Sequence, residues 1–270
     1  MNTVRDLSAA SGLPRLEARM LLEHVLGVPR AWLLAHDTDP LDRAACQRFG
    51  RLAALRRDGQ PMAYLVGRRE FMGRDFAVTP DVLIPRPDTE LLVETALECL
   101  RDRPRGTVLD LGTGSGAIAV SLALALPGAT VWATDASAAA LAVARGNAER
   151  LGARVDFAQG DWYGALPPGP RFDLIVSNPP YVAAGDPHLS EGDLRFEPAA
   201  ALTDGGDGLG ALRAIVAGAR DRLAPGGALW LEHGWNQSRA VRACLAAAGF
   251  SSVASRRDLA GIERISGGSL

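Results

Sequence analysis

Two short stretches of the sequence carry residues that could do chemistry, and each follows a predicted β-strand. The first, VLDLGTGSGAIAV, runs from an apolar strand through a glycine turn into the start of a helix. Such a turn brings a ligand close to the backbone N–H groups of the helix N-terminus. The second, FDLIVSNPPYVAA, is an apolar strand that stops at an amide, two prolines and an aromatic ring, residues 178 to 181. Together they predict a ligand pocket beside a reaction centre.

The glycine turn fits two classes of cofactor. Gly112, Gly114 and Ala117 satisfy the G-x-G-x-x-A pattern, and Asp135 ends the next predicted strand, where a dinucleotide site has its ribose-binding acid. Asp110 favours the other class. A carboxylate just before the glycines repels a pyrophosphate, whereas the ammonium group of S-adenosylmethionine can pair with it directly or through water. The turn therefore indicates a methyl donor, with glycines that serve only a tight turn as the alternative.

Two more residues fit a nucleoside pocket. The segment QGDWYGAL follows the third predicted strand, so Asp161 could accept a hydrogen bond from the adenine amino group while Trp162 packs on the ring. Core packing explains Trp162 equally well. The position at the carboxyl edge of a predicted parallel sheet supports the pocket interpretation.

The residues from Asn178 to Tyr181 suit the methylation of a planar, weakly nucleophilic nitrogen. The side-chain carbonyl of Asn178 and the backbone carbonyl of Pro179 can each accept one N–H, which stabilises the charge that grows on nitrogen. The prolines stiffen these acceptors, and Tyr181 can stack on a flat substrate group. The methylated nitrogen becomes acidic and can lose its proton afterwards, so no strong base is required. A rigid turn without chemistry is the alternative.

Short helices and then alternating strands and helices must position these residues. We expect a small N-terminal helical bundle over residues 1 to 59, a β-hairpin linker over 60 to 84, and an α/β domain over 85 to 270 with a doubly wound, mostly parallel sheet. The two last strands predict an antiparallel hairpin at the sheet edge. Predicted strands cover residues 107 to 111, 130 to 135, 154 to 159, 172 to 178 and 227 to 233, and predicted helices 116 to 126, 137 to 151, 208 to 223 and 236 to 247.

Composition excludes several functions. A net charge of -2 and a pI near 6.1 argue against stable nucleic-acid binding through a basic surface. The cysteines, Cys46, Cys99 and Cys244, lie too far apart for a zinc site or a disulfide framework, so no metal is expected. The longest apolar run, residues 117 to 126, is too short to cross a membrane, and the N-terminus has no signal-peptide pattern. A cytoplasmic protein, acting as a monomer, is expected.

The chain resembles the class I, Rossmann-like methyltransferases, and among them the bacterial release factor glutamine methyltransferases. The acid-glycine loop and NPPY are shared with many methyltransferases, whereas LIPRPDTE and FEPAAALTDGGDGL are much more particular. The resemblance implies methyl transfer from S-adenosylmethionine, with S-adenosylhomocysteine as product, to the side-chain nitrogen N5 of the glutamine in the Gly-Gly-Gln motif of peptide chain release factors. It also implies that the N-terminal bundle recognises the release factor.

The residue roles follow from the motifs and the resemblance together. Donor binding is expected from Asp110, Gly112, Thr113, Gly114, Ser115, Gly116, Asp135, Asp161, Trp162 and Asn178. Substrate binding is expected from Asn178, Pro179, Pro180 and Tyr181, and a catalytic part from Asn178, Pro179 and Tyr181.

Two other functions compete with this one. N6-adenine methylation of DNA or RNA uses the same NPPY residues, but the mild acidity and the lack of a basic, aromatic-rich stretch disfavour it. A nicotinamide-dependent oxidoreductase is disfavoured because four histidines and no lysine leave few proton donors.

Several other charged or loop positions lie near these motifs. We expect Arg86 and Glu90 to form an ion pair at a helix start, capped by Asp88 or Thr89, and His233 to be a hydrogen-bonded structural residue. The loop from 196 to 198 is expected near the site, although a surface loop with a packed Phe196 explains it almost as well.

Overall fold

The computed structural model describes residues 2 to 270, and the chain divides into two compact units. The first unit holds the residues up to Arg68 together with Glu191–Phe196, and the second holds Arg69–Ser190 with Glu197–Leu270. The segment from 191 to 196 thus belongs to the first unit although both of its flanks belong to the second. The sequence-based boundaries at residues 59 and 84 stay predictions.

The first unit consists of helices that share one apolar core. Their bounds are α1 Val4–Ala10, α2 Arg15–Leu26, α3 Arg30–Ala35, α4 Arg43–Arg57 and α5 Met62–Val66, with the 3-10 turn η4 Leu194–Phe196. A capping box begins α1, because Thr3 and Asp6 each accept a hydrogen bond from the other's backbone N–H. Side chains such as Leu21, Leu22 and Phe49 are fully buried between the helices. The helical character predicted for this stretch is confirmed.

A two-stranded hairpin begins the next part of the chain. It pairs β1 Arg68–Phe71 with β2 Arg74–Ala77, and the rings of Phe71 and Phe76 meet edge to face with centroids 6.0 Å apart. The hairpin prediction is confirmed for residues 68 to 77 and wrong for Met62–Val66, which form α5. Short apolar runs fit both the two-residue period of a strand and the 3.6-residue period of a helix. Here Pro61 and the left-handed Gly67 bound one short helix.

The second unit contains a mainly parallel sheet. Among the described residues it has seven strands in the order β5-β4-β3-β6-β7-β9-β8. Their bounds are β3 Thr107–Leu111, β4 Thr130–Asp135, β5 Asp156–Gln159, β6 Phe172–Ser177, β7 Leu223–Glu232, β8 Ser251–Arg257 and β9 Glu263–Ser269. The strand β9 runs antiparallel to both β7 and β8, while the other pairs are parallel. The predicted antiparallel hairpin at the sheet edge is confirmed.

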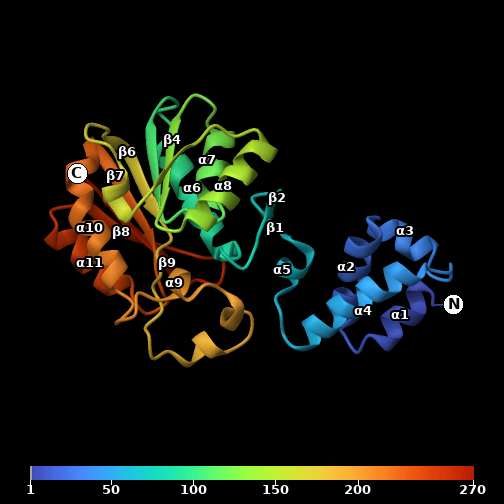
Figure 1. Ribbon diagram of the computed structural model, residues 1–270. Helices are drawn as coiled ribbons and strands as arrows, with labels where there is room; N and C mark the ends of the chain where they lie inside the picture. The colour runs from blue at the N-terminus through green and yellow to red at the C-terminus, as the bar shows by residue number, and fades with distance from the viewer. Residues whose placement is uncertain (1) are drawn as a thin grey trace. The chain divides into compact units, whose positions relative to one another are not determined.

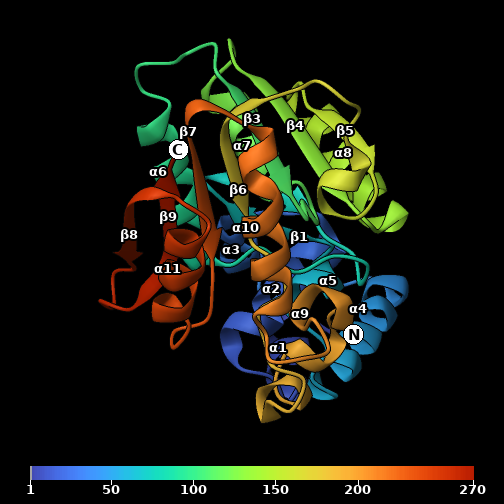
Figure 2. The ribbon, with the colours of Figure 1, turned by 90° about the vertical axis from the view of Figure 1, so that its left-hand side faces the viewer.

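Helices cover both faces of this sheet, as Figure 1 and Figure 2 show. On one face lie α6 Glu90–Cys99, α7 Ala117–Ala125 and α8 Ala138–Leu151; on the other lie α10 Gly210–Arg222 and α11 Ser238–Ala247. Neighbouring strand residues point to opposite faces. In β3, Val108 belongs to the core under α6 and α7, and Leu109 to the core under α10 and α11. The expected α/β class and doubly wound architecture are confirmed.

The strand order creates the site. β3 pairs with β4 on one side and with β6 on the other. The chain therefore runs from β3 through β4 to β5 on one side of β3 and then returns to form β6 on the other side. Open α/β sheets bind ligands at the carboxyl ends of the strands where this reversal occurs. The remaining short elements, mostly around these ends, are η1 Pro87–Thr89, η2 Trp162–Ala165, η3 Pro187–Ser190 and α9 Ala199–Leu202. Within residues 2 to 270, no helix combines the length and apolar character needed to span a bilayer.

Candidate active site

The acid-glycine loop leaves β3 and enters α7. The backbone N–H groups of Gly112 and Thr113 both donate to the carbonyl of Thr134 on β4, at 2.9 Å each. Gly116 precedes α7 with a φ of 82°, and a Cβ there would lie 3.1 Å from the Cβ of Ala144. Only glycine can adopt this positive φ and also leave room for Ala144 without strain. The loop is therefore held tightly, with the N-terminus of α7 at the end of β3.

Asp110 lies inside this loop. Its side chain is fully buried, and Oδ2 accepts hydrogen bonds from the Thr113 hydroxyl at 2.6 Å and the Ala119 N–H at 3.2 Å. Burial raises the pKa of Asp110 to about 7, although both hydrogen bonds lower it. Since Asp110 does not line the cavity described below, the structure shows no direct path to a ligand's ammonium group, and its part in donor binding stays a prediction.

Asp135 joins β4 to the same loop. Its Oδ2 accepts from the Gly114 N–H and its Oδ1 from the Ser137 N–H, both at 2.9 Å. The residue ends β4, so the carboxylate lies one strand away from the glycines. It is half-buried and lines the cavity, which leaves it within reach of a ligand.

Asp161 and Trp162 follow β5. Asp161 is exposed, and its carboxylate makes no hydrogen bond to any described residue. Trp162 has a φ of 42°, and its ring lies 3.4 Å from where a Cβ on Gly112 would be. A non-glycine residue with positive φ is uncommon and marks a constrained position. The ring packs on the glycine loop from one side and lines the cavity from the other.

These segments enclose a cavity of about 380 Å³ within the second unit. That volume lies in the range of small-molecule sites. Of the predicted residues it is lined by Gly112, Thr113, Gly114, Ser115, Asp135, Asp161, Trp162, Asn178 and Pro180. The structure does not place Asp110, Gly116, Pro179 or Tyr181 on the wall. Sequence reasoning missed the segment before η1, which lines the cavity with Asp81, Val82, Leu83 and Pro85. The LIPRPDTE motif marks only the part of it from Leu83 onward.

Carboxylates outnumber cations along this wall. Asp81, Asp135 and Asp161 line it, and Arg86 is the one arginine among the described lining residues. The Arg86 guanidinium is itself neutralised by Glu197, with Nη2 2.7 Å from both carboxylate oxygens. A wall with this balance attracts a cationic ligand and disfavours a pyrophosphate.

The pair of Arg86 and Glu197 corrects one prediction. Arg86 does not pair with Glu90, whose Oε1 accepts from the Met72 N–H at 2.7 Å instead. The predicted helix-start ion pair is wrong because Glu197 is 111 positions away in sequence and only the tertiary fold brings it to Arg86. The Glu197 side chain is fully buried, so the ion pair fixes the loop that also places Pro198 on the cavity wall.

Asn178 directly follows β6, beside the acid-glycine loop. Its Nδ2 donates to the Thr89 hydroxyl at 3.1 Å, and its Oδ1 has no hydrogen-bond partner among the described residues. The predicted caps at Asp88 and Thr89 are wrong, since neither side chain caps η1 or α6. Thr89 instead holds the nitrogen end of the Asn178 amide, which leaves the oxygen end free as an acceptor.

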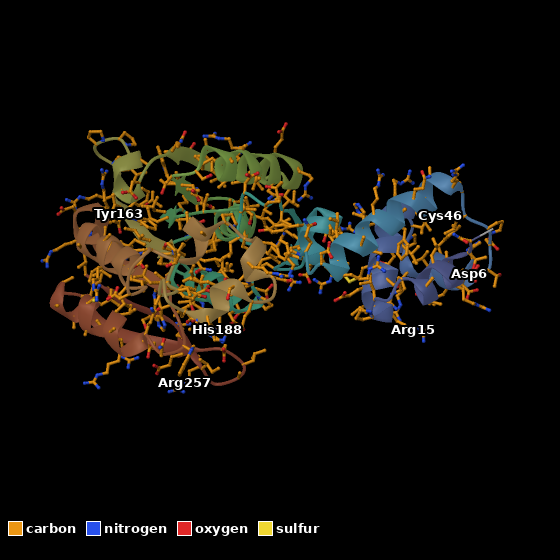
Figure 3. All side chains as sticks on the ribbon, turned by 60° about the horizontal axis from the view of Figure 1, so that its bottom comes forward. Asp6, Arg15, Cys46, Tyr163, His188 and Arg257 are labelled. Atoms are coloured by element: carbon orange, nitrogen blue, oxygen red, sulfur yellow. The ribbon has the colours of Figure 1, made fainter. Side chains whose placement is uncertain are left out.

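The rest of the NPPY segment divides between cavity and core. Pro180 lines the cavity, Pro179 is buried, and the ring of Tyr181 packs against the core under α10 and α11. The Tyr181 hydroxyl donates to Oε1 of Glu232 at 3.2 Å, and burial raises its pKa above the ordinary value. Tyr163, labelled in Figure 3, packs against the same core, and its hydroxyl donates a 2.8 Å hydrogen bond to the carbonyl of Ile215 in α10. The ring of Tyr181 is thus held by the fold, and its predicted stacking on substrate stays a prediction.

Two loops outside the glycine turn hold the NPPY segment in place. The Oε1 of Gln237 accepts a hydrogen bond from the Gly234 N–H at 2.8 Å. Its Nε2 donates to the Tyr181 carbonyl at 2.9 Å. Asp204 organises the DGGDG loop by accepting backbone N–H groups at Gly206, Gly208 and Gly210. Asp204 lies in FEPAAALTDGGDGL, a motif that carries the family resemblance.

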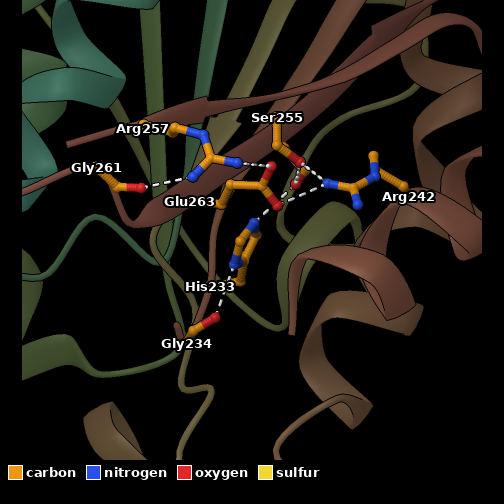
Figure 4. Close-up of polar contacts among 8 residues, drawn as sticks. His233, Gly234, Arg242, Ser255, Arg257, Gly261 and Glu263 are labelled. Carbon is orange, nitrogen blue, oxygen red and sulfur yellow. Dashed lines mark hydrogen bonds and ion pairs between the residues drawn. The ribbon is translucent and has the colours of Figure 1, made fainter. Parts of the chain in front are cut away.

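His233 is a hydrogen-bonded part of the fold, as predicted. Its Nδ1 donates to the Gly234 carbonyl at 2.9 Å, and its Nε2 lies 2.7 Å from the Ser266 hydroxyl. Figure 4 shows how Ser255 and Arg242 extend this network across the edge hairpin. Burial lowers the pKa of His233, so the ring is neutral near pH 7 and accepts the hydrogen bond from Ser266.

Known families match both parts of the chain. The family model described as "Methyltransferase small domain" matches residues 88–209, and the one described as "PrmC N-terminal domain" matches residues 2–67. The first match contains the glycine loop and NPPY.

Curated relatives match along the full length. A release factor glutamine methyltransferase of Bordetella pertussis is 67% identical over 270 residues, which cover 100% of both chains. One of Burkholderia pseudomallei is 58% identical over 274 residues, covering 99% of this chain and 96% of the relative. Among solved structures, a T. thermophilus 16S rRNA methyltransferase in complex with AdoMet and guanosine is 23% identical, with a TM-score of 0.55 over 75% of this chain and 49% of that one. That likeness shows the fold.

Proposed function

The chain belongs to the release factor glutamine methyltransferases, and we propose from this premise how its cavity holds the donor and the glutamine. It is an S-adenosylmethionine-dependent enzyme that methylates a glutamine of peptide chain release factors. The proposal concerns the finer points: the nitrogen N5 of the Gly-Gly-Gln glutamine as acceptor, and the residues that perform each part.

The cavity wall fits the methyl donor. Its excess of carboxylates suits a ligand with sulfonium and ammonium charges, and Trp162 offers a flat apolar surface for an adenine ring. At Gly114 a Cβ would meet no heavy atom within 4 Å, so space for a ligand remains next to the loop. We assign donor binding to Gly112, Thr113, Gly114, Ser115, Asp135, Asp161 and Trp162, with Asp110 and Gly116 supporting the loop from behind. No metal ion takes part in the proposal.

Asn178 and Pro179 hold the glutamine. The donor, when bound, supplies an electrophilic methyl group on sulfur. The Asn178 Oδ1 and the Pro179 carbonyl accept the two N–H groups of the glutamine amide, which turns the nitrogen lone pair toward the methyl carbon. As the C–N bond forms and the C–S bond breaks, these oxygens stabilise the positive charge on nitrogen, and one N–H proton then leaves to water. Pro180 and Tyr181 keep this acceptor pair rigid.

One observation carries the assignment: the nitrogen end of the Asn178 amide is bonded to Thr89 while its oxygen end has no partner among the described residues. An unpaired acceptor at the cavity suits an N–H donor from a substrate.

Transfer of label from radioactive donor tests the function. We expect label on a release factor and none on the same factor with alanine in place of the motif's glutamine. Bulk DNA and RNA serve as further substrates, and label on them with none on the release factor would support adenine methylation instead.

Several finer points stay predictions. The bundle of α1 to α5 matches the family's N-terminal domain, which supports a part in gripping the release factor. A net charge of -2 supports the absence of stable nucleic-acid binding. A monomeric state and a cytoplasmic location complete the proposal, and light scattering of the purified protein tests the first.

A further inference from the structure

A buried carboxyl group lies behind the NPPY segment. Glu232 ends β7, the strand next to β6, and is only 1% exposed. Its Oε1 accepts the hydrogen bond from Tyr181, whereas its Oε2 has no ordinary hydrogen bond among the described residues. A buried, incompletely paired carboxyl group costs stability, so its presence calls for a function.

Thr89 connects this carboxyl to the reaction centre. The Thr89 hydroxyl accepts from the Asn178 amide. It also lowers the pKa of Glu232, although it makes no hydrogen bond of ordinary geometry to either carboxylate oxygen. Thr89 is itself 5% exposed, so water does not compete freely for its hydroxyl. The three residues come from η1, the end of β6 and the end of β7.

The chemistry of the three groups fixes the direction of this chain of contacts. An ionised carboxylate can only accept hydrogen bonds, so a Thr89 hydroxyl that turns toward the unpaired Oε2 of Glu232 presents its hydrogen to it. The lone pairs of that hydroxyl are then left to accept from an N–H. Of the two ends of the Asn178 amide, only the nitrogen end can supply one, so the oxygen end faces away from Thr89.

We propose that Glu232 is a positioning residue for methyl transfer, which acts through Thr89 to hold the Asn178 amide with its oxygen toward the substrate nitrogen. This inference rests on the proposed function of Asn178. Without the carboxylate, the Thr89 hydrogen can turn to Asn178 and stabilise the flipped amide. The flipped amide presents an NH2 group to the substrate NH2, and two donors cannot pair.

The surroundings of Glu232 make this lock sensitive to pH. Burial raises its pKa to about 7, the hydroxyls of Thr89 and Tyr181 lower it, Asp88 raises it, and Arg264 lowers it. Arg264 is shared, because it also pairs with Asp88 at 3.2 Å and with Asp258 at 2.8 Å. Protonated Glu232 can donate as well as accept, so the direction of the contacts is lost as the pH falls through about 7. The glutamine amide does not titrate in this range.

Single-turnover methyl transfer to a release factor tests the proposal with Glu232→Gln, an isosteric change that replaces an acceptor by a group that can donate. We expect the transfer rate to fall about 30-fold, equivalent to about 2 kcal/mol. Donor affinity by calorimetry and KM for the release factor should stay within about threefold, since neither ligand touches Glu232. The wild-type rate should decline below about pH 7 and the variant's should not.

Thr89→Val provides an independent variant in case Glu232→Gln does not fold. It should lose about as much activity and also lose the pH dependence, while Thr89→Ser should restore most of the rate. The double variant should show about the loss of one substitution rather than the product of two, because both break the same chain of contacts. Asp110→Asn should keep the decline below about pH 7, which separates Glu232 from the other buried carboxyl with a similar pKa.

The wild-type rate on the release factor decides the proposed function, and the ratio of variant to wild type decides the role of Glu232. A Glu232→Gln enzyme with the wild-type rate and pH profile overturns the proposal. So does a variant whose donor binding, KM and transfer rate decline together, since a purely structural role predicts that result.

Discussion

The half of the cavity that we assign to the methyl donor and the half that we assign to the acceptor are built in different ways. On the donor half, hydrogen bonds run between residues close in sequence or to the neighbouring strand: Thr113 to Asp110, Gly116 to Thr113, and Gly114 to Asp135. On the acceptor half, the contacts join distant segments. Asn178 is held by Thr89 from 89 positions away, and Arg86 is held by Glu197 from 111.

This difference separates binding from alignment. Backbone N–H groups in a glycine loop have fixed directions, so the donor half is shaped once its strand and helix form. A side-chain amide can point either end at its target, so the acceptor half needs further side chains to choose. We therefore expect substitutions on the donor half to change affinity, and substitutions on the acceptor half to change turnover.

Asn178→Ala should have the largest effect. Removing a group that stabilises charge in the transition state lowers turnover by about 10²- to 10³-fold. Single-turnover transfer to a release factor measures it, and calorimetry should show donor affinity within about threefold of wild type. A large loss of donor affinity with little change in turnover would place Asn178 on the donor half. It would contradict the expectation that substitutions on the acceptor half change turnover.

Asp110→Asn should change the pH dependence of stability. The pKa of Asp110 is raised from 3.8 to about 7, so between these pH values the folded state holds a proton that the unfolded state has released. Stability therefore falls as the pH rises through this window, and the neutral variant avoids the loss. Relative to wild type, the free energy of unfolding of Asp110→Asn should gain about 2 kcal/mol between about pH 5 and about pH 8.

Asp173→Asn is the matched control for that experiment. The pKa of Asp173 is lowered by hydrogen bonds from Thr107 and by Arg103, against its burial. Its contribution is complete above the unfolded pKa and is lost only as the pH falls below it. Denaturant titrations should thus show a constant difference from wild type between about pH 5 and about pH 8. Parallel curves for both variants would mean that Asp110 is not the buried titrating group.

Arg86→Ala tests the long-range pairing of the acceptor half. It leaves the fully buried carboxylate of Glu197 without its guanidinium, which should lower the free energy of unfolding by about 2 kcal/mol. Chemical denaturation measures the loss. Arg103→Ala breaks the more exposed pair with Asp173 and should cost less than about 1 kcal/mol. Equal losses would show that burial of Glu197 contributes nothing.

Asp135→Ala should have the smallest of these effects and should act on affinity. The variant loses both the support of the Gly114 N–H and a carboxylate on the cavity wall. Donor affinity should weaken about tenfold, the size expected for loss of a charged hydrogen-bond partner. At saturating donor the turnover should stay within about threefold. Unchanged affinity in calorimetry would contradict the assignment of Asp135 to the donor.

Prediction from sequence succeeded where neighbours in sequence are neighbours in space. The strands and helices of the second unit and the glycine turn follow from local patterns, because each needs only a few consecutive residues. It failed for α5, where an apolar alternation fits strand and helix alike. It also failed for Arg86, whose nearest acidic residue in sequence is not its partner.

The sequence by itself determined the fold class and the class of reaction, because hydrophobic periodicity and short motifs such as DLGTGSG and NPPY act within one element. Only the tertiary structure decided how the amide of Asn178 is oriented, which side chains line the cavity, and that Glu232 lies buried behind Tyr181. The physical reason is that a side-chain hydrogen bond depends on distance and direction in space. Neither is encoded in the spacing of residues that come from different strands.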